Sequence, residues 1–494
     1  MRLVVPLQGV VQGRGGLLLG SLIPCALFYF LQLYLKRHRS DGSSRIPLSP
    51  PPSEIPPTTS VQVSNLANFL AEFDDSPDDI GLQSLAQDSY DHDRFTNPDK
   101  MIQLSSSENK LCLDLIEKWL SENLKKSLVG TDDFTLSVNG IATYQPFDGL
   151  EELKMAMSNF MSRVMGGMVK LDPSNMVLTS GATPAIEMLS FCLANQEDAF
   201  LVPAPYYPGF DKDVKWRARV NLIPVHCQSE DNFTLSIATL EEVYRQAEKR
   251  GVKVRGLLFS NPANPVGNLL TQDMLKSLVH FAKNKNIHII ADEVLAGSVY
   301  EGEKFVSLAE VLDSEGLDKN RVHIIYGLSK DLSLAGFRVG VIYSFNNTVL
   351  AAARKLSRFS SISAPTQRLV ISMLSDNKFI PEYFETKQKR IRQVRDELEA
   401  GLSHLGIKCA KSSAGLYCWA DMRGLLRKPH NERRELELWK KFISVSKIII
   451  TPGSACHCIE PGWFGICFCE LTSENIPVII ERIRKVVETC KSSC

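Results

Sequence analysis

The middle of the chain alternates short apolar runs, rich in β-branched residues, with longer stretches in which apolar positions recur every three or four residues. Buried parallel strands produce the first pattern, and helices that cover a sheet produce the second. The predicted strands are residues 176–179, 199–202, 256–259, 287–290 and 322–325, and helices are expected to begin at Pro184 and Thr271. This order predicts an α/β fold with a large, mostly parallel sheet that helices cover on both faces.

Two further regions flank this predicted sheet. Residues 108–124 have the spacing of a helix, with apolar side chains at Leu111, Leu115, Ile116, Trp119 and Leu120. After residue 346 long helical stretches dominate, interrupted by short predicted strands at 416–420 and 447–451. We therefore expect a large domain of residues 141–345 and a smaller α+β domain of residues 346–494, with residues 99–140 as the N-terminal segment of the small domain.

An apolar segment stands near the start of the chain. As a helix, residues 17–35 would be about 28 Å long, close to the roughly 30 Å of a bilayer's hydrocarbon core. Four consecutive basic residues, 36–39, follow it. The positive-inside rule would then leave the rest of the protein in the cytosol. We expect residues 1–39 to be a membrane anchor with a basic flank, and a segment that targets an organelle is the alternative.

Composition limits which partners, metals and covalent cross-links are expected. Residues 40–98 are first rich in Pro and Ser and then acidic, which predicts a linker. Lys and Arg (56) balance Asp and Glu (56). No basic blocks alternate with aromatic residues, so a nucleic-acid partner is not expected. The 12 cysteines form no evident disulfide framework. The cysteines around His457 lack the usual zinc-ligand spacing, so no metal is expected.

One lysine follows the last predicted strand of the sheet. Lys330 lies five residues after residue 325, and Arg338 lies eight residues further on. A lysine can form a Schiff base with a carbonyl cofactor, and an arginine can bind a phosphate through two parallel hydrogen bonds. A surface lysine and arginine beside a turn would give the same pattern, so the interpretation depends on the other predicted strand ends.

Those strand ends carry matching candidates. Residues 180–183 lie between a strand and a helix and can bind a phosphate or simply cap the helix. Asp292 follows residues 287–290 and can keep a pyridine nitrogen protonated, or cap a turn. Asn264 lies between two prolines and can donate to a ring oxygen, or shape a turn. Tyr206 and Tyr207 can stack on a flat ring or belong to the core. Ligands of open α/β sheets bind at the carboxyl ends of strands, where all of these residues are expected.

These groups occur in the order of fold-type I pyridoxal 5′-phosphate (PLP) enzymes, and the sequence resembles the plant 1-aminocyclopropane-1-carboxylate (ACC) synthase family. The resemblance covers roughly residues 102–485, and the strings that carry it are residues 179–187, 205–211, 328–331 and 456–464. With its apolar N-terminal segment, the chain is similar to the divergent, membrane-anchored branch described as aminotransferases. The resemblance implies a large PLP-binding domain, a smaller α+β domain, and a homodimer that shares its active sites.

The resemblance also implies roles for individual residues. Lys330 would form the Schiff base with PLP and serve as general base and acid. Asp292 would contact the pyridinium nitrogen, Asn264 the ring hydroxyl, and Tyr207 the ring face. The phosphate would be held by Ala182, Thr183, Ser329 and Arg338. Two further residues are expected near the substrate, namely Glu108, which matches an acid of the synthases, and Tyr144.

The chain departs from the family at four positions. Gly465 follows Trp463-Phe464 where the family has the arginine that binds the substrate α-carboxylate. Phe147 and Leu295 each stand where the synthases have a tyrosine. Gly327 replaces a phosphate-binding serine. The phosphate and ring contacts of the cofactor are therefore better supported than the contacts of the substrate.

Three functions remain open from the sequence. An aminotransferase would act on an amino acid of the aspartate or aromatic type and on a 2-oxo acid, through a Schiff base at Lys330 and with activity weakened by Gly465. An ACC synthase would act on S-adenosylmethionine in ethylene biosynthesis. The third alternative is a PLP-binding regulatory protein with little catalysis.

Overall fold

The computed structural model describes residues 64–71, 94–129, 138–302, 304–315 and 317–492. Residues from 65 onward form one compact unit. The expected anchor at residues 1–39 and most of the linker at residues 40–98 lie outside the described residues. Within the described ranges, no helix is long and apolar enough to span a bilayer.

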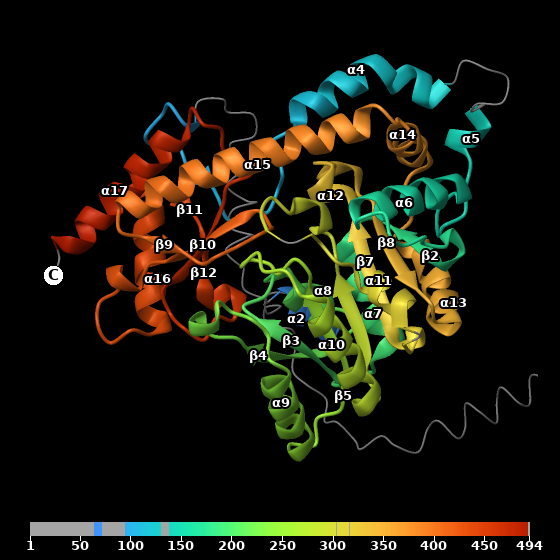
Figure 1. Cartoon of the computed structure of the whole chain (residues 1–494), viewed down its shortest axis with the longest axis horizontal. Helices are drawn as coiled ribbons and strands as arrows, with labels where there is room; N and C mark the ends of the chain where they lie inside the picture. The colour runs from blue at the N-terminus through green and yellow to red at the C-terminus, as the bar shows by residue number, and fades with distance from the viewer. Residues whose placement is uncertain (1–63, 72–93, 130–137, 303, 316, 493–494) are drawn as a thin grey trace, which may run out of the picture. The chain divides into compact units, whose positions relative to one another are not determined.

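A seven-stranded sheet forms the centre of the unit (Figure 1). Its spatial order is β2-β8-β7-β6-β5-β3-β4. Strands β3 to β7 pair in parallel, and β8 runs antiparallel to both β7 and β2. The strands are β2 (Met176–Thr179), β3 (Ala199–Ala204), β4 (Asn221–His226), β5 (Val254–Ser260), β6 (His288–Asp292), β7 (Val322–Gly327) and β8 (Gly340–Ser344). The expected mostly parallel sheet is confirmed.

Helices cover both faces of this sheet because successive strand residues point to opposite sides. On β6, Ile290 belongs to one apolar cluster and Ile289 to the other. The Ile290 cluster includes residues of α7 (Ala182–Leu193), α8 (Gly209–Lys215) and α13 (Asn347–Leu356). The Ile289 cluster includes residues of α6 (Glu151–Val164), α9 (Ile237–Lys249), α10 (Gln272–Lys285), α11 (Leu308–Glu315) and α14 (Ala364–Leu374).

A second sheet, with the order β12-β13-β10-β9, has its own apolar core. Its strands are β9 (Lys408–Cys409), β10 (Tyr417–Asp421), β12 (Thr451–Pro452) and β13 (Trp463–Cys467), and they pair antiparallel. Beside them β1 (Ile102–Gln103) pairs in parallel with β11 (Ile448–Ile449). The helices that complete this core are α15 (Phe379–His404), α16 (Glu432–Lys441) and α17 (Ile476–Lys491). The α/β and α+β architecture expected of a fold-type I enzyme is thus present.

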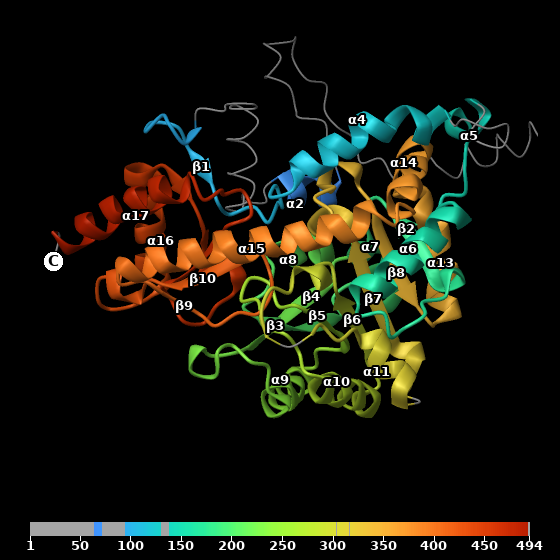
Figure 2. The same ribbon diagram turned by 45° about the horizontal axis from the view of Figure 1, so that its top comes forward.

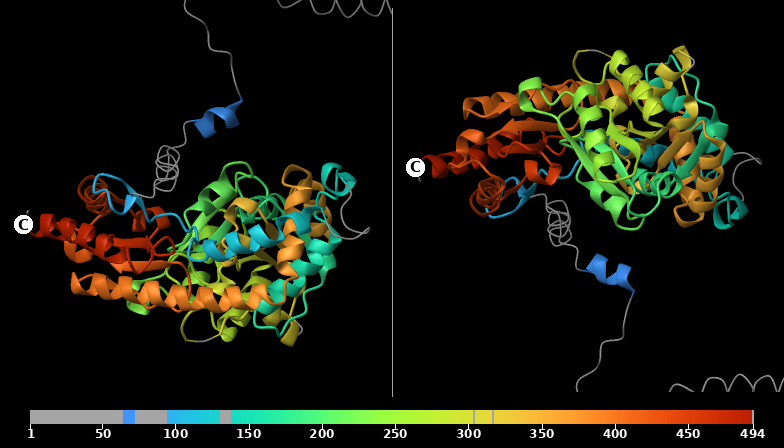
Figure 3. Two further views of the ribbon diagram at one scale, coloured as in Figure 1. Left: turned by 90° about the horizontal axis from the view of Figure 1, so that it is seen from above. Right: turned by 90° about the horizontal axis from the view of Figure 1, so that it is seen from below.

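Two helices connect the separate parts of the unit. The first half of α15 buries Ile380 and Tyr383 in the core of the large sheet, and its second half buries Leu398 and Leu402 in the smaller core. Figure 3 shows α15 extending past both sheets. The helix predicted at residues 108–124 is α4 (Leu113–Val129), which packs on α14 (Figure 2). The domain boundaries stay predictions.

Candidate active site

The carboxyl ends of three neighbouring strands bring the main candidates to one edge of the large sheet. Lys330 lies in α12 (Leu328–Asp331), which follows β7 directly (Figure 1). Asp292 is the last residue of β6, and Asn264 lies in the loop after β5. The amide of Asn261, at the start of that loop, donates to the carbonyl of Asp292 over 2.9 Å. The sheet order therefore places the predicted lysine, carboxylate and amide side by side.

Asp292 is a buried carboxylate close to a positive charge. Its oxygens accept hydrogen bonds from the Ser260 hydroxyl at 3.2 Å and from the Val294 amide at 3.3 Å. Burial raises the pKa of Asp292 to about 6, although these hydrogen bonds and the charge of Lys330 lower it in part. A positively charged ring nitrogen at this position would stabilise the carboxylate further.

The side chain of Lys330 reaches a loop from the N-terminal part of the chain. Its Nζ donates to the Ser107 carbonyl at 2.7 Å and to the Ser107 hydroxyl at 2.5 Å. The Asn109 amide group donates to the backbone carbonyl of Lys330 at 2.9 Å. These contacts could not be anticipated from the sequence, because Ser107 and Asn109 precede Lys330 by more than 200 residues.

The N-terminus of α7 and Arg338 form a compact cradle. Gly181 has φ +106°, and a Cβ atom there would lie 2.3 Å from Nη2 of Arg338. A Cβ atom on Gly340 would lie 2.3 Å from the carbonyl carbon of Gly181. The backbone before Ala182 and Thr183 can approach the guanidinium only because both positions are glycine. A helix N-terminus beside an arginine suits a phosphate group. Ser329, the fourth predicted phosphate contact, lies beside Lys330 in α12.

A second buried carboxylate, Asp213 in α8, was missed by the sequence interpretation. It accepts a hydrogen bond from Thr183, and its Oδ2 has no hydrogen-bond partner among the described residues. Burial raises the pKa of Asp213 well above its usual range, and the charge of Asp292 adds to this effect. In the sequence Asp213 belongs to a charged run, residues 211–213, that is typical of a solvated helix face.

The two adjacent tyrosines have different surroundings. Tyr206 is buried, stacks on the ring of His457 with centroids 4.6 Å apart, and bonds Asp211. Tyr207 is half-buried, and its ring makes an edge contact with Phe210 at 5.6 Å. A Cβ atom on Gly209 would lie 2.2 Å from the Tyr207 ring, so the glycine permits this ring position. Of the pair, Tyr207 is the better candidate for stacking on a cofactor.

The two residues expected near the substrate differ in position. Glu108 directly follows Ser107, the partner of Lys330, and its carboxylate lies 3.2 Å from the ammonium of Lys110. Tyr144 follows α5 (Val138–Ala142), is 95% exposed, and contacts the ring of Phe147 with centroids 6.4 Å apart. The single chain therefore places Glu108 next to a partner of the lysine, whereas it leaves Tyr144 in solvent.

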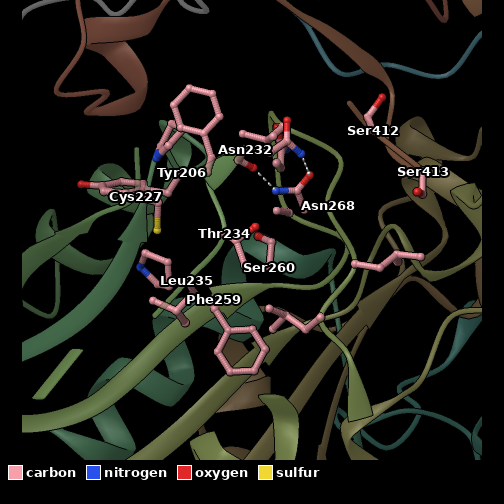
Figure 4. A pocket seen from close by; sticks show the side chains of 18 of the residues that line it. Tyr206, Cys227, Asn232, Thr234, Leu235, Phe259, Ser260, Asn268, Ser412 and Ser413 are labelled. Carbon is pink, nitrogen blue, oxygen red and sulfur yellow. Dashed lines mark hydrogen bonds between the residues drawn. The ribbon is translucent and has the colours of Figure 1, made fainter. Parts of the chain in front are cut away.

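A cleft of about 810 Å³ adjoins these residues through Ser260 and Asn264 (Figure 4). Its aromatic lining consists of Tyr206, Phe210, Phe233 and Phe259. Arg395, at the same cleft, is already paired with the carboxylates of Glu301, Asp396 and Glu399. The cleft therefore combines an aromatic lining with polar groups that include Lys411.

The structure shows what surrounds three of the positions at which the chain departs from the family pattern. A Cβ atom on Gly465 would lie 3.4–3.6 Å from Tyr417, Thr451 and Trp419, which is ordinary van der Waals contact. A Cβ atom on Gly327 would lie 3.1 Å from the carbonyl oxygen of Val339, so a serine there would require a small shift. Leu295 is 3% exposed. The missing arginine is therefore not explained by a lack of room at the Cβ of residue 465.

The donor set fits PLP. A primary amine and a buried carboxylate lie at adjacent strand ends. The amine can bond to the aldehyde of PLP, and the carboxylate can keep its ring nitrogen protonated. The glycine-lined cradle beside Arg338 suits the phosphate, and the half-buried Tyr207 suits the ring face. No group in this set conflicts with the cofactor, although its contacts with individual residues stay predictions.

Comparison with known proteins gives a consistent result. A family model described as aminotransferase class I and II matches residues 99–483. The chain is 54% identical to the "Probable aminotransferase ACS12" of Arabidopsis thaliana, with 100% of both chains covered. It is 51% identical to "1-aminocyclopropane-1-carboxylate synthase 6" of Oryza sativa subsp. japonica, covering 99% of this chain and 94% of that protein.

Solved structures show the same fold. The structure of aspartate aminotransferase from Thermus thermophilus with maleate has a TM-score of 0.67 at 19% identity, covering 86% of this chain and 100% of that chain. The aromatic aminotransferase from Pyrococcus horikoshii OT3 has a TM-score of 0.65 at 21% identity, covering 79% of this chain and 96% of that chain. At these identities the likeness concerns the fold alone.

Proposed function

This chain belongs to the aminotransferase class I and II family and its cofactor is PLP, and from this premise we propose that it transfers the amino group of an amino acid to a 2-oxo acid. One observation carries the proposal: Lys330 and the buried Asp292 lie at adjacent strand ends, close enough for the charge of the lysine to lower the pKa of the carboxyl group. That arrangement provides a base beside a group that keeps a ring nitrogen protonated.

In this proposal each residue has one task. When bound, PLP supplies an electron-withdrawing ring that stabilises negative charge at the substrate Cα. The amine of Lys330 would take the proton from the substrate Cα and, as an ammonium, would give it back, which is the proton movement that transamination requires. Asp292 would hold the ring nitrogen in its charged form, Asn264 would donate to the ring hydroxyl, and Tyr207 would cover the ring. The phosphate is held by Ala182, Thr183, Ser329 and Arg338.

The substrate contacts are the weakest part of this site. Without an arginine at position 465, two charge-assisted hydrogen bonds to the α-carboxylate are missing, each worth about 1.5–3 kcal/mol. At 1.4 kcal/mol per factor of ten, the loss is roughly 10²–10⁴ in efficiency. The aromatic residues that line the adjoining cleft support an aromatic donor.

A second function has support from Glu108. Its position next to Ser107, the partner of Lys330, favours an ACC synthase that acts on S-adenosylmethionine, and a relative carries that name. The two enzymatic functions differ in their products, since only the synthase releases ACC and only the aminotransferase releases a 2-oxo acid. A PLP-binding regulatory protein would release neither.

The proposal extends to assembly and attachment. The 95% exposure of Tyr144 and its contact with Phe147 support a homodimer in which this region faces a second copy.

The composition of residues 17–35 supports a membrane tether with a cytosolic catalytic domain. Deleting residues 17–35 should release the protein from membranes in a fractionation experiment, and an unchanged distribution would remove the tether.

The central experiment combines absorbance with product analysis. The purified full chain with PLP should show the absorbance band of a lysine-bound cofactor. Lys330→Ala should abolish this band, whereas the exposed Lys170→Ala should retain it. A panel of aspartate, aromatic amino acids and S-adenosylmethionine then separates the three functions. A wild-type protein that stays colourless with added PLP would rule out both enzymatic functions.

A further inference from the structure

A short loop contacts Lys330 from outside the large sheet. Residues 105–109, here called the serine loop, contain three consecutive serines followed by Glu108 and Asn109. Ser105 is 1% exposed and Ser107 is 7% exposed. The loop follows β1 of the small core, so a segment far from Lys330 in the sequence supplies two hydrogen-bond acceptors to its amine.

Hydrogen bonds fix both ends of the serine loop. The carbonyl of Ser105 accepts from the Tyr417 hydroxyl at 2.7 Å and from the Thr451 hydroxyl at 3.3 Å. At the other end, Asn109 donates to the backbone carbonyl of Lys330. Tyr417 and Thr451 also flank the Cβ direction of Gly465. The loop is therefore held between the position of the missing arginine and the backbone of Lys330.

The two groups of Ser107 that meet Lys330 are chemically different. The carbonyl, 2.7 Å from Nζ, can only accept a hydrogen bond. The hydroxyl, 2.5 Å from Nζ, can accept from an ammonium and, after rotation, donate to the lone pair of a neutral amine. The charged or titratable groups that act on Lys330 from other elements include Asp292 on β6 and Cys469, which follows β13. Of the two Ser107 groups, only the hydroxyl is suited to both protonation states of the amine.

We propose that Ser107 is a positioning residue for Lys330, holding the released amine in both its neutral and its protonated form and aiming it at the substrate Cα. This inference rests on the proposed transaminase function. The neutral amine takes the Cα proton and becomes an ammonium, which then donates a hydrogen bond to the Ser107 hydroxyl. The ammonium gives the proton to the cofactor carbon and is neutral again, so the proton balance closes without any other reactant.

The test compares three variants of the full chain. Ser107→Ala removes the hydroxyl and keeps the carbonyl, and Ser107→Thr restores a hydroxyl. Ser106→Ala, at the partly exposed neighbouring serine, is the matched control. The first readout needs no turnover. An amine-selective acylating reagent is applied to the cofactor-free chain over a range of pH, and peptide mass spectrometry measures labelling of Lys330.

Ser107→Ala should move the midpoint of Lys330 labelling to lower pH by about half a unit or more, because the charge-assisted hydrogen bond that the ammonium loses is stronger than the bond that the neutral amine loses. The labelling midpoints of Ser107→Thr and Ser106→Ala should stay within about 0.2 pH units of the wild-type midpoint, because both variants keep a hydroxyl at residue 107. With PLP bound, the pH titration of the absorbance band should shift in Ser107→Ala alone, and kcat should fall about tenfold with little change in KM.

An unchanged labelling midpoint in Ser107→Ala would overturn the inference, and so would an equal shift in Ser106→Ala. If Ser107→Ala unfolds, Ser107→Thr decides, because a folded threonine variant with an altered labelling midpoint also contradicts the inference. Failure of the proposed function would look different. Wild type would then show no transamination with any donor, while the labelling midpoints would still test whether Ser107 bonds the amine of Lys330.

Discussion

The ammonium of Lys387 lies 3.1 Å from the carboxylate of Asp331, and both side chains are 1% exposed. The same ammonium donates to the Asp331 carbonyl at 3.0 Å. The other carboxylate oxygen accepts from the Tyr326 hydroxyl at 2.6 Å and from the Gly297 amide at 2.9 Å. Since Asp331 is the residue after Lys330, this buried pair fixes α12 to α15, the helix that joins the two cores.

Removing the cation of this pair should destabilise the protein strongly. Lys387→Met leaves the buried Asp331 carboxylate without its counter-ion, and such losses cost about 3–5 kcal/mol. Urea denaturation of the full chain measures the change, and the exposed Lys389→Met on the same helix is the control. Equal stabilities of the two variants would mean that the hydrogen bonds from Tyr326 and Gly297 are sufficient.

Exchanging each of the two buried carboxylates for an amide should show which of them serves the cofactor ring. Burial raises the pKa of Asp213 well above its usual range and so disfavours its charged form, which Asp213→Asn removes with little change in side-chain size. Asp292→Asn removes the partner of a protonated ring nitrogen. We expect kcat to fall by about a hundredfold or more for Asp292→Asn and by less than about threefold for Asp213→Asn. The reverse order would assign the ring nitrogen to Asp213.

Much of the sheet could be predicted from the sequence because its inner strands are continuous apolar runs. Two strands were not predicted. The edge strand β4 begins with the exposed Asn221 and contains Pro224, so it does not look like a buried strand. The antiparallel strand β8 starts only two residues after Arg338, so it follows the predicted strand at 322–325 without an intervening long helix. Apolar runs therefore identify the parallel inner strands and the fully buried edge strand β2, but not the partly exposed edge strand β4 or β8, which follows a sharp reversal.

The residues of the candidate site also fall into those that the sequence could predict and those that it could not. Lys330 and Asp292 could be found because each lies within five residues of the end of a predicted strand, and strand ends converge in a parallel sheet. Ser107 and Asp213 could not, because their importance comes from partners far away in the sequence. Tyr144 was expected at the site but is 95% exposed in the single chain, so its predicted role depends on a second copy.

Restoring the arginine at position 465 should strengthen substrate binding. A Cβ atom fits there at ordinary contact distances, and an arginine would offer the α-carboxylate two charge-assisted hydrogen bonds. Gly465→Arg should therefore raise the kcat/KM of transamination by more than about tenfold. The control is Gly424→Arg, at an exposed glycine with no neighbour within 4 Å of a Cβ atom. An unchanged rate in Gly465→Arg would mean that another group already binds the carboxylate.

The buried Glu293, next to Asp292, should make stability depend on pH. Burial raises the pKa of Glu293 to about 7, although hydrogen bonds from the Leu308 amide at 2.8 Å and the Ser307 hydroxyl at 2.7 Å lower it in part. An acid whose pKa is higher in the folded than in the unfolded state favours folding at low pH. That contribution is lost as the pH rises from about 4.5 through about 7.

The amide that Glu293→Gln introduces cannot ionise, so the variant does not lose this contribution to stability as the pH rises. Its free energy of unfolding, relative to wild type, should rise between about pH 5 and about pH 8 by up to roughly 3 kcal/mol. Urea denaturation at several pH values measures the difference. The exposed Glu382→Gln should show no such trend. A difference that stays constant over this range would mean that Glu293 ionises normally and that water or local rearrangement solvates it.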